Sequence, residues 1–396
     1  MTRVILVSGK GGVGKTTVAA ATSVMAARRG HRTVVVSMDR AHNLGGVLGA
    51  ELGAKPLPVA GCEHLRAMEV DPQTELREHE AALEGYFARF LAWAGLASGV
   101  HADEVAVIPG LEELLMLSRL AIVIDEAGAD VVVVDLAPTA SSLKLLSFPE
   151  LMAGPLGKLT AWERRFLRIA RPAAKKLISA PIPEEATYEA IDALTARLRA
   201  LRDLLVDSAR CVVRLVSIPE RVVVDETRSA YTALALFGLT VDSIVMNRVL
   251  PKELARGYLG DWTRIQKREI ERARSSFPGL ELRQLRFQPS EVLGVAALEQ
   301  TGDELYGSTD PARFAHTTPP LRFHTERGTP MLSLDLPHAN DRELDLQQRD
   351  GELIVTVGAW RRQLLLPESL RTRDVTNAHF ANGTLRVEFA SRKEKS

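Results

Sequence analysis

Gly9-Lys10-Gly11-Gly12-Val13-Gly14-Lys15-Thr16 is the stretch that decides the fold. It follows a short run of apolar, mostly β-branched residues and opens a helical pattern, and this context distinguishes a P-loop from a chance glycine-rich turn. The glycines let successive backbone N–H groups turn toward phosphate oxygens, and the start of the helix adds partial positive charge. We expect Lys15 to neutralise the β- and γ-phosphates and the Thr16 hydroxyl to bind Mg²⁺, so the stretch through Thr17 predicts a nucleoside triphosphate site.

The pattern around this loop, from residue 1 to about 305, alternates β-branched runs with helical periodicity. This alternation predicts an α/β domain with a doubly wound, mostly parallel sheet of the P-loop NTPase type. The expected strands are Val4–Ser8, Thr33–Ser37, Leu65–Val70, Val131–Val134, Cys211–Ser217, Ile244–Met246 and Leu282–Phe287. Polar residues, Pro or Gly follow several of them, at the carboxyl edge of the sheet where such folds bind ligands.

Three polar residues after these strands are candidates for the chemistry at that edge. Asp39 is expected to orient the attacking water and to lie at the metal, and Asp135 to hold Mg²⁺ through its waters, because phosphoryl transfer depends on positioning and charge neutralisation. A lone Asp after a strand is often a helix cap, but two of them beside this loop favour the catalytic interpretation. Asn247 could hydrogen-bond the base. No Asn-Lys-x-Asp guanine motif follows a strand, so adenine is favoured.

Helical periodicity alone continues between about residues 150 and 206, which predicts a helical insertion. Apolar residues recur there in two runs: Leu159, Trp162, Phe166 and Ile169, and then Ile191, Leu194, Leu198, Leu201 and Leu205. Ordinary core packing explains any single one of them. As a set, the residues of the first run fit about equally well a hydrophobic groove that accepts an apolar helix.

A second, smaller domain is expected at the C-terminus. Residues 306–325 are rich in Pro, Thr and Gly and have the composition of a linker. From about 326 to 393 the period becomes two, and the hairpin signals Asp350-Gly351 and Asn382-Gly383 separate candidate strands. This pattern predicts a small all-β sandwich.

The composition limits the possible partners. Lys+Arg and Asp+Glu number 50 each, so no net charge attracts nucleic acid or an anionic membrane, and we expect no nucleic-acid partner. The two cysteines, Cys62 and Cys211, can form neither a disulfide framework nor a cysteine-based metal cluster within one chain, which favours the cytoplasm. The N-terminus leaves no room for a signal peptide, and no uncharged stretch is long enough to cross a bilayer, so any membrane contact is expected to be peripheral.

The additional lysine of the loop, Lys10, resembles the deviant P-loop of a class of dimeric ATPases. This class includes the nitrogenase iron protein, the septum-site and plasmid-partition ATPases and the ArsA-type ATPases. In that class the extra lysine reaches across a dimer interface to the phosphates of the partner. The resemblance therefore implies a homodimer, since this chain has one P-loop; the alternative is a solvated loop lysine.

Within that class the chain resembles the ArsA and guided-entry (tail-anchored-protein-targeting) ATPases. Asp39-Arg40-Ala41-His42-Asn43-Leu44 is similar to their switch I, with Arg40 in place of the usual Pro. Asp135-Leu136-Ala137-Pro138-Thr139 is similar to their switch II, with Leu136 in place of Thr. Asn247-Arg248-Val249-Leu250-Pro251 and Pro289-Ser290-Glu291-Val292 resemble downstream and adenine-contacting segments, which implies that Asn247 and Pro289 lie at the nucleotide.

The C-terminal region resembles the α-crystallin domain of small heat-shock proteins. The residues that carry this resemblance are Asp350-Gly351-Glu352-Leu353-Ile354-Val355, Leu365-Leu366-Pro367 and Asn382-Gly383-Thr384-Leu385-Arg386-Val387. Such modules are fused to bacterial and plastid members of this ATPase family. The sequence ends in a charged tail without the Ile-x-Ile anchor of small heat-shock proteins, so we expect no large oligomeric shell.

These resemblances imply a homodimeric switch that hydrolyses ATP with Mg²⁺ and binds hydrophobic client segments in a targeting or chaperone role. The implied catalytic residues are Asp39, Lys10 and Lys15. Two other classes stay open: a P-loop metabolic enzyme, which needs a polar substrate pocket beside the γ-phosphate, and a partition-type ATPase acting on DNA or a membrane. Arsenite efflux is disfavoured, because the metalloid-binding cysteines of arsenite pumps have no counterpart here.

Overall fold

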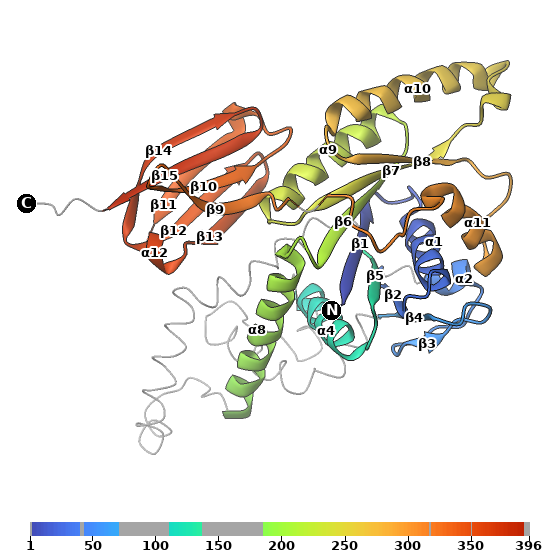
Figure 1. Cartoon of the computed structure of the whole chain (residues 1–396), viewed down its shortest axis with the longest axis horizontal. Helices are drawn as coiled ribbons and strands as arrows, with labels where there is room; N and C mark the ends of the chain where they lie inside the picture. The colour runs from blue at the N-terminus through green and yellow to red at the C-terminus, as the bar shows by residue number, and fades with distance from the viewer. Residues whose placement is uncertain are drawn as a thin grey trace, which may run out of the picture. The chain divides into compact units, whose positions relative to one another are not determined.

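The computed structural model of the chain describes residues 2–39, 43–70, 111–136, 185–316, 318–349 and 351–391, without the side chains of residues 111–115 and 185–191. The described residues divide into two compact units. The first contains residues 2–70, 124–136 and 203–391 within those ranges, and the second contains residues 111–123 and 185–202. A large, mostly parallel sheet with its helices and a separate antiparallel β-sandwich both lie in the first unit (Figure 1).

Eight strands form the large sheet, in the order β3-β4-β2-β5-β1-β6-β7-β8. They are β1 (Arg3–Gly9), β2 (Thr33–Ser37), β3 (Leu57–Pro58), β4 (Leu65–Glu69), β5 (Val131–Asp135), β6 (Cys211–Ser217), β7 (Val241–Val249) and β8 (Glu281–Arg286). Neighbouring strands are parallel except β3 and β4. Each predicted strand overlaps one of these, and the predicted fold class is confirmed. The β-branched runs are buried on both faces, as parallel strands covered by helices require.

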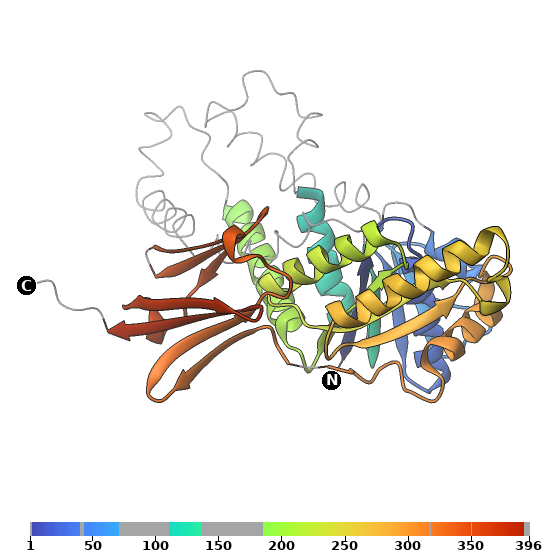
Figure 2. The ribbon, with the colours of Figure 1, turned by 90° about the horizontal axis from the view of Figure 1, so that it is seen from above.

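Helices cover both faces of this sheet (Figures 1 and 2). α1 (Lys15–Arg28), α2 (Leu44–Leu48) and α11 (Gly294–Tyr306) pack together on one face, and α9 (Arg221–Leu236) and α10 (Tyr258–Ser276) lie on the other. The first unit also contains η2 (Lys252–Leu254), whereas α4 (Leu111–Glu126) and α8 (Glu185–Val206) lie mostly in the second unit. Within the part of the chain that is described, no helix has the length and apolar character needed to cross a bilayer.

α8 corresponds to the second of the two predicted helical runs. Leu198, Leu201 and Leu205 are buried, as the helical spacing of apolar residues predicts. The first run, Leu159 to Ile169, and the rest of the predicted insertion up to residue 184 lie outside the described residues. The client groove therefore stays a prediction.

The C-terminal sandwich consists of two antiparallel sheets, in the orders β14-β15-β10-β9 and β11-β12-β13. The strands are β9 (Leu321–Glu326), β10 (Thr329–Asp335), β11 (Leu344–Arg349), β12 (Glu352–Val357), β13 (Trp360–Leu365), β14 (Arg373–Ala381) and β15 (Thr384–Ser391), with the short helices η3 (Asp341–Glu343) and α12 (Glu368–Arg371). Alternate residues of both sheets, including Leu332, Val355 and Phe389, form its core. β9 lies within the segment expected to be linker, so ordered sandwich structure begins at Leu321.

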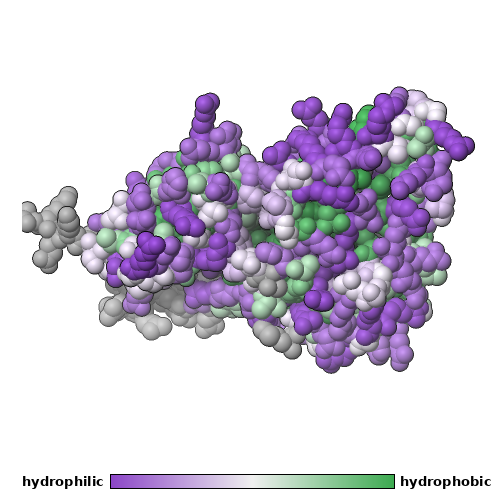
Figure 3. All heavy atoms as spheres, turned by 45° about the horizontal axis from the view of Figure 1, so that its top comes forward, coloured by the Kyte–Doolittle hydropathy of each residue, from purple (hydrophilic) through white to green (hydrophobic). Residues whose placement is uncertain are grey.

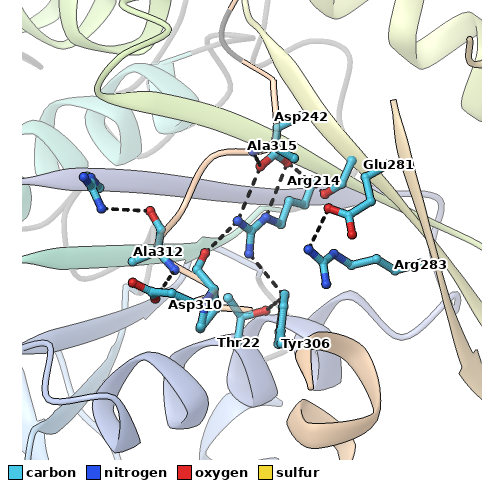
Figure 4. Close-up of polar contacts among 12 residues, drawn as sticks. Thr22, Arg214, Asp242, Glu281, Arg283, Tyr306, Asp310, Ala312 and Ala315 are labelled. Carbon is cyan, nitrogen blue, oxygen red and sulfur yellow. Dashed lines mark hydrogen bonds and ion pairs between the residues drawn. The ribbon is translucent and has the colours of Figure 1, made fainter. Parts of the chain in front are cut away.

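Residues 307–316, also expected to be linker, lie against the large sheet as a strap (Figure 4). The buried Arg214 guanidinium lies 3.4 Å from the buried Asp242 carboxylate and donates hydrogen bonds to the Pro311 carbonyl at 2.7 Å and the Tyr306 hydroxyl at 3.2 Å. Further contacts join Arg3 to the carbonyl of Ala312, Arg29 to the carbonyls of Gly307 and Ser308, and His31 to Asp310. Buried charges need such complete pairing, so the strap is an integral part of the core.

The sandwich packs against α9 and α10. The buried Arg362 of β13 donates a hydrogen bond to the carbonyl of Leu236 at the C-terminal end of α9, and Thr232 donates one to Pro337. The ring of His338 meets Tyr231 and Phe277 edge-on, and burial, with the nearby Arg228 charge, lowers the pKa of His338 to about 4. A neutral imidazole at this contact is consistent with its apolar surroundings.

Candidate nucleotide site

The P-loop joins β1 to α1, and two of its glycines are required by their surroundings. A Cβ atom on Gly9 would lie 2.2 Å from the Val216 carbonyl oxygen of the neighbouring strand β6. Gly14 has φ +94°, and a Cβ atom there would lie 2.3 Å from Nδ2 of Asn247. Between them Val13 is buried and anchors the loop to the core. The loop is therefore pressed closely against the carboxyl ends of the central strands.

The two lysines of the loop have different environments. Lys15 is buried at the start of α1, and its Nζ lies 3.4 Å from the carbonyl oxygen of Lys10. The Lys10 ammonium instead points to α9, where it lies 2.7 Å from the Glu226 carboxylate, and both side chains are more than 40% exposed. An exposed ion pair of this kind contributes little stability, so Lys10 can exchange Glu226 for another anion at small cost.

The structure brings together two of the three predicted metal ligands. The Thr16 hydroxyl donates a hydrogen bond of 2.7 Å to Oδ2 of Asp135, which is fully buried at the end of β5. The other carboxylate oxygen, Oδ1, is also buried and has no hydrogen-bond partner among the described residues. Burial raises the pKa of Asp135 to about 6. The hydrogen bond from Thr16 and the positive charge of Lys15 lower this pKa, and the negative charge of Asp39 raises it.

A magnesium ion fits this arrangement. A buried carboxylate oxygen without a hydrogen-bond partner, beside a hydroxyl, suits a cation, and Mg²⁺ in nucleotide sites uses one or two protein ligands, with phosphate oxygens and waters as the rest. The described residues contain no cluster of three or more His, Cys, Asp or Glu side chains that could hold a metal without such help. Metal binding at Thr16 and Asp135 would thus depend on a bound nucleotide.

Asp39, the third predicted ligand, lies next to this pair. It follows β2, which pairs with β5 so that Ser37 faces Asp135. Its backbone N–H donates a hydrogen bond to the Ser37 hydroxyl at 3.3 Å. The following residues of the predicted switch I, 40–42, and those of switch II after Leu136 lie outside the described residues. The role of Asp39 in orienting water stays a prediction.

Asn247 contacts the loop itself. Its Nδ2 donates a hydrogen bond of 2.8 Å to the Val13 carbonyl, and its Oδ1 accepts one of 2.8 Å from the N–H of Arg248. In this structure the side chain therefore supports the P-loop, and contact with adenine stays a prediction. Pro289 lies exposed just after β8, at the same edge of the sheet.

Two residues near the site were not predicted from the sequence: Glu226, which pairs with Lys10, and Gln266 of α10. Gln266 lies on the buried face of an amphipathic helix, together with Ile270 and Ala273. A polar residue at such a core position is a signal that could have been noticed, because buried amides need hydrogen-bond partners. Its partners, however, are the backbone of Arg248 in β7 and of Leu250 just after β7, and they cannot be inferred from local sequence.

Comparisons with known proteins agree with this geometry. Residues 2–307 match the family described as anion-transporting ATPase (ArsA ATPase), and residues 328–389 match the HSP20-like domain found in ArsA. A putative arsenical pump-driving ATPase of Prosthecochloris vibrioformis is 34% identical over 395 residues, which cover 99% of this chain and 97% of that protein. ATPase ASNA1 homolog 1 of Paramecium tetraurelia is 27% identical over 75% of this chain and 90% of its own length. ATPase GET3A of Arabidopsis thaliana is 28% identical over 74% of this chain and 81% of its own length.

Proposed function

Because the chain belongs to the ArsA family of ATPases and carries the HSP20-like domain of that family, we propose that it is a Mg²⁺-dependent ATPase that works as a homodimeric switch for hydrophobic client segments. The observation that carries the proposal is that Thr16 of the P-loop donates a hydrogen bond to Asp135 at the carboxyl edge of the sheet. The proposed location is the cytoplasm, and the GET3A and ASNA1 relatives support the targeting role.

The residues of the site have distinct roles in this proposal. Backbone N–H groups of the loop and the Lys15 ammonium neutralise the phosphates, and Thr16 and Asp135 hold Mg²⁺, which supplies further charge neutralisation when bound. Asp39 orients the attacking water. Lys10 leaves Glu226 and binds the phosphates of the partner subunit. Asn247 and Pro289 lie toward adenine.

ATP binding and hydrolysis are tested with two substitutions. Lys15→Ala removes the phosphate counter-charge and is expected to abolish tight ATP binding, whereas Asp39→Asn is expected to retain binding and slow turnover by at least about tenfold. Titration with labelled ATP measures binding, and phosphate release with and without Mg²⁺ measures turnover and its dependence on the metal. Wild-type turnover in Asp39→Asn would contradict the role of Asp39, and metal-independent turnover would contradict the role of Mg²⁺.

The homodimer is tested at Lys10. Light scattering with a non-hydrolysable ATP analogue should show pairing of the wild-type chain and clearly weaker pairing of Lys10→Ala. Glu226→Gln is the matched control, because it removes the same ion pair while leaving the lysine available. An equal dimer fraction in wild type and Lys10→Ala would exclude a role in trans.

The client hypothesis competes with two others. A pull-down in the ATP state separates them: apolar helical segments support the client role, a small-molecule product supports a metabolic enzyme, and DNA or lipid supports a partition-type ATPase. We propose that the sandwich assists client protection, so deletion of residues 321–396 should retain ATP binding and reduce protection of an aggregating apolar client. Equal protection by the truncated chain would contradict this role.

The name of the Prosthecochloris relative suggests arsenite transport as a second candidate function. The residues of this chain do not favour it. Cys62 and Cys211 are both buried, and burial raises the pKa of each thiol, which disfavours the thiolate that binds soft metalloids. Stimulation of ATP turnover by arsenite would reverse this ranking.

A further inference from the structure

β7 contains a β-bulge beside the P-loop. Met246 pairs with Gln284 and Val249 with Arg286, so that two residues of β7, Asn247 and Arg248, face one residue of β8. Arg248 has φ +56°, in the left-handed region that residues other than glycine rarely occupy. Bulges re-aim side chains and are frequent next to functional sites. Here the re-aimed side chain is Asn247, which bonds to the Val13 carbonyl of the P-loop.

Gln266 holds this bulge from α10. Its Nε2 donates a hydrogen bond of 3.1 Å to the carbonyl of Arg248, and its Oε1 accepts one of 2.7 Å from the N–H of Leu250. Gln266 is 9% exposed, so water has limited access to the two bonds, which are both partly buried. The Arg248 N–H in turn donates to Asn247 Oδ1. An unbroken series of hydrogen bonds therefore runs from Gln266 through Arg248 and Asn247 to the loop.

We propose that Gln266 is a positioning residue for nucleotide binding, which fixes the left-handed bulge and thereby keeps Asn247 on the P-loop. The inference rests on the proposed assignment of this loop to ATP. The physical reason is the cost of the left-handed conformation: without Gln266, an arginine at position 248 relaxes toward negative φ, and the Asn247 amide moves with it. Asn247 Nδ2 lies 2.3 Å from the position that a Cβ atom on Gly14 would occupy, so movement of Asn247 changes the packing of the loop whose N–H groups must converge on phosphate.

The first test compares two bridging glutamines. Gln348 of β11 donates to the Arg373 carbonyl at 2.7 Å and accepts from the Val375 N–H at 2.8 Å, which is the same kind of bridge but lies inside the sandwich. ATP dissociation constants are measured by calorimetry at a temperature where circular dichroism shows every variant folded. Gln266→Ala is expected to weaken ATP binding roughly three- to tenfold, and Gln348→Ala by less than about twofold.

The second test separates positioning from general destabilisation. Glycine adopts positive φ freely, so Arg248→Gly removes the need for Gln266 to hold the bulge. Gln266→Ala should therefore cost less than about twofold in ATP affinity in the Arg248→Gly background. An equal loss in both backgrounds, or unchanged affinity of Gln266→Ala, overturns the inference. A wild-type chain that does not bind ATP overturns the proposed function, and this inference with it.

Discussion

At the scale of single residues, the P-loop glycines differ in what a methyl group would meet. A Cβ atom on Gly11 would have no atom within 4 Å, and φ of Gly11 is not positive. A Cβ atom on Gly12 would also have open space, but φ of Gly12 is +80°. At Gly14, φ is +94° and a Cβ atom would clash with Asn247. We therefore predict that alanine costs less than about 0.5 kcal/mol of unfolding free energy at Gly11, about 1 kcal/mol at Gly12 and more than about 2 kcal/mol at Gly14. Urea unfolding of the nucleotide-free variants gives this order, and a Gly12→Ala cost equal to that of Gly14→Ala would show that Asn247 is not the obstacle.

Asp135 should make the stability of the metal-free protein depend on pH. Its pKa is raised from 3.8 to about 6 by burial, so the folded state binds the proton more tightly than the unfolded state. The free energy of unfolding should then fall as pH rises from about 4 to about 6, by at most about 3 kcal/mol. Unfolding in EDTA across this range should show that component in wild type and lose it in Asp135→Asn. The same slope in both proteins would place the titration elsewhere.

At the scale of elements, two hairpins of the sandwich have the same turn with different residues. Arg327-Gly328 has φ +49° and +82°, and Asn382-Gly383 has φ +52° and +74°. Asparagine adopts the first position of such a turn at lower conformational cost than arginine does. Arg327→Asn is predicted to stabilise the protein by roughly 0.5–1 kcal/mol and Asn382→Arg to destabilise it by a similar amount. Thermal unfolding of the two variants checks both signs, and changes of the same sign would contradict this explanation.

The Arg327-Gly328 hairpin also shows where sequence patterns stop being informative. The predicted strands contain β-branched runs or alternate clearly, whereas Leu321–Glu326, most of which was expected to be linker, contains two apolar residues in a segment rich in Pro and Thr. Its strand conformation comes from pairing with β10, which is a tertiary effect. The P-loop was predictable because its chemistry lies within one short stretch. Gln266 and Glu226 were not, because their partners lie on other elements: Gln266 of α10 bonds to backbone at the end of β7, and Glu226 of α9 pairs with Lys10 of the P-loop.

At the scale of the whole molecule, Arg362 is one of the side chains that join the sandwich to the ATPase part. Figure 3 shows mainly hydrophilic side chains on the visible surface of both parts, with apolar side chains gathered in a recess of the ATPase part. Arg362 is buried and lies 3.3 Å from the position that a Cβ atom on Gly238 would occupy. Replacing it with alanine leaves the Leu236 carbonyl without its donor and opens a cavity.

We predict that Arg362→Ala lowers the free energy of unfolding by roughly 2–4 kcal/mol and speeds hydrogen exchange at the end of α9. Arg361 is the matched control, since it is the preceding residue of β13 and is exposed. Arg361→Ala should change stability by less than about 0.5 kcal/mol. Equal exchange at the end of α9 in the two variants would show that the sandwich is held by other contacts.

The strap of residues 307–316 has a consequence for how the chain folds during its synthesis. β1, the central strand, pairs with β6, which begins at Cys211, and Arg3 beside it bonds to the carbonyl of Ala312. A ribosome adds roughly 5–20 residues per second, so about 15–60 s separate the synthesis of β1 from that of the strap that completes its surroundings. During this interval β1 lacks part of its native surroundings, and until β6 is made it also lacks one of its two neighbouring strands. The newly synthesised ATPase domain therefore exposes apolar surface, and this surface is a binding site for chaperones at the ribosomal exit tunnel.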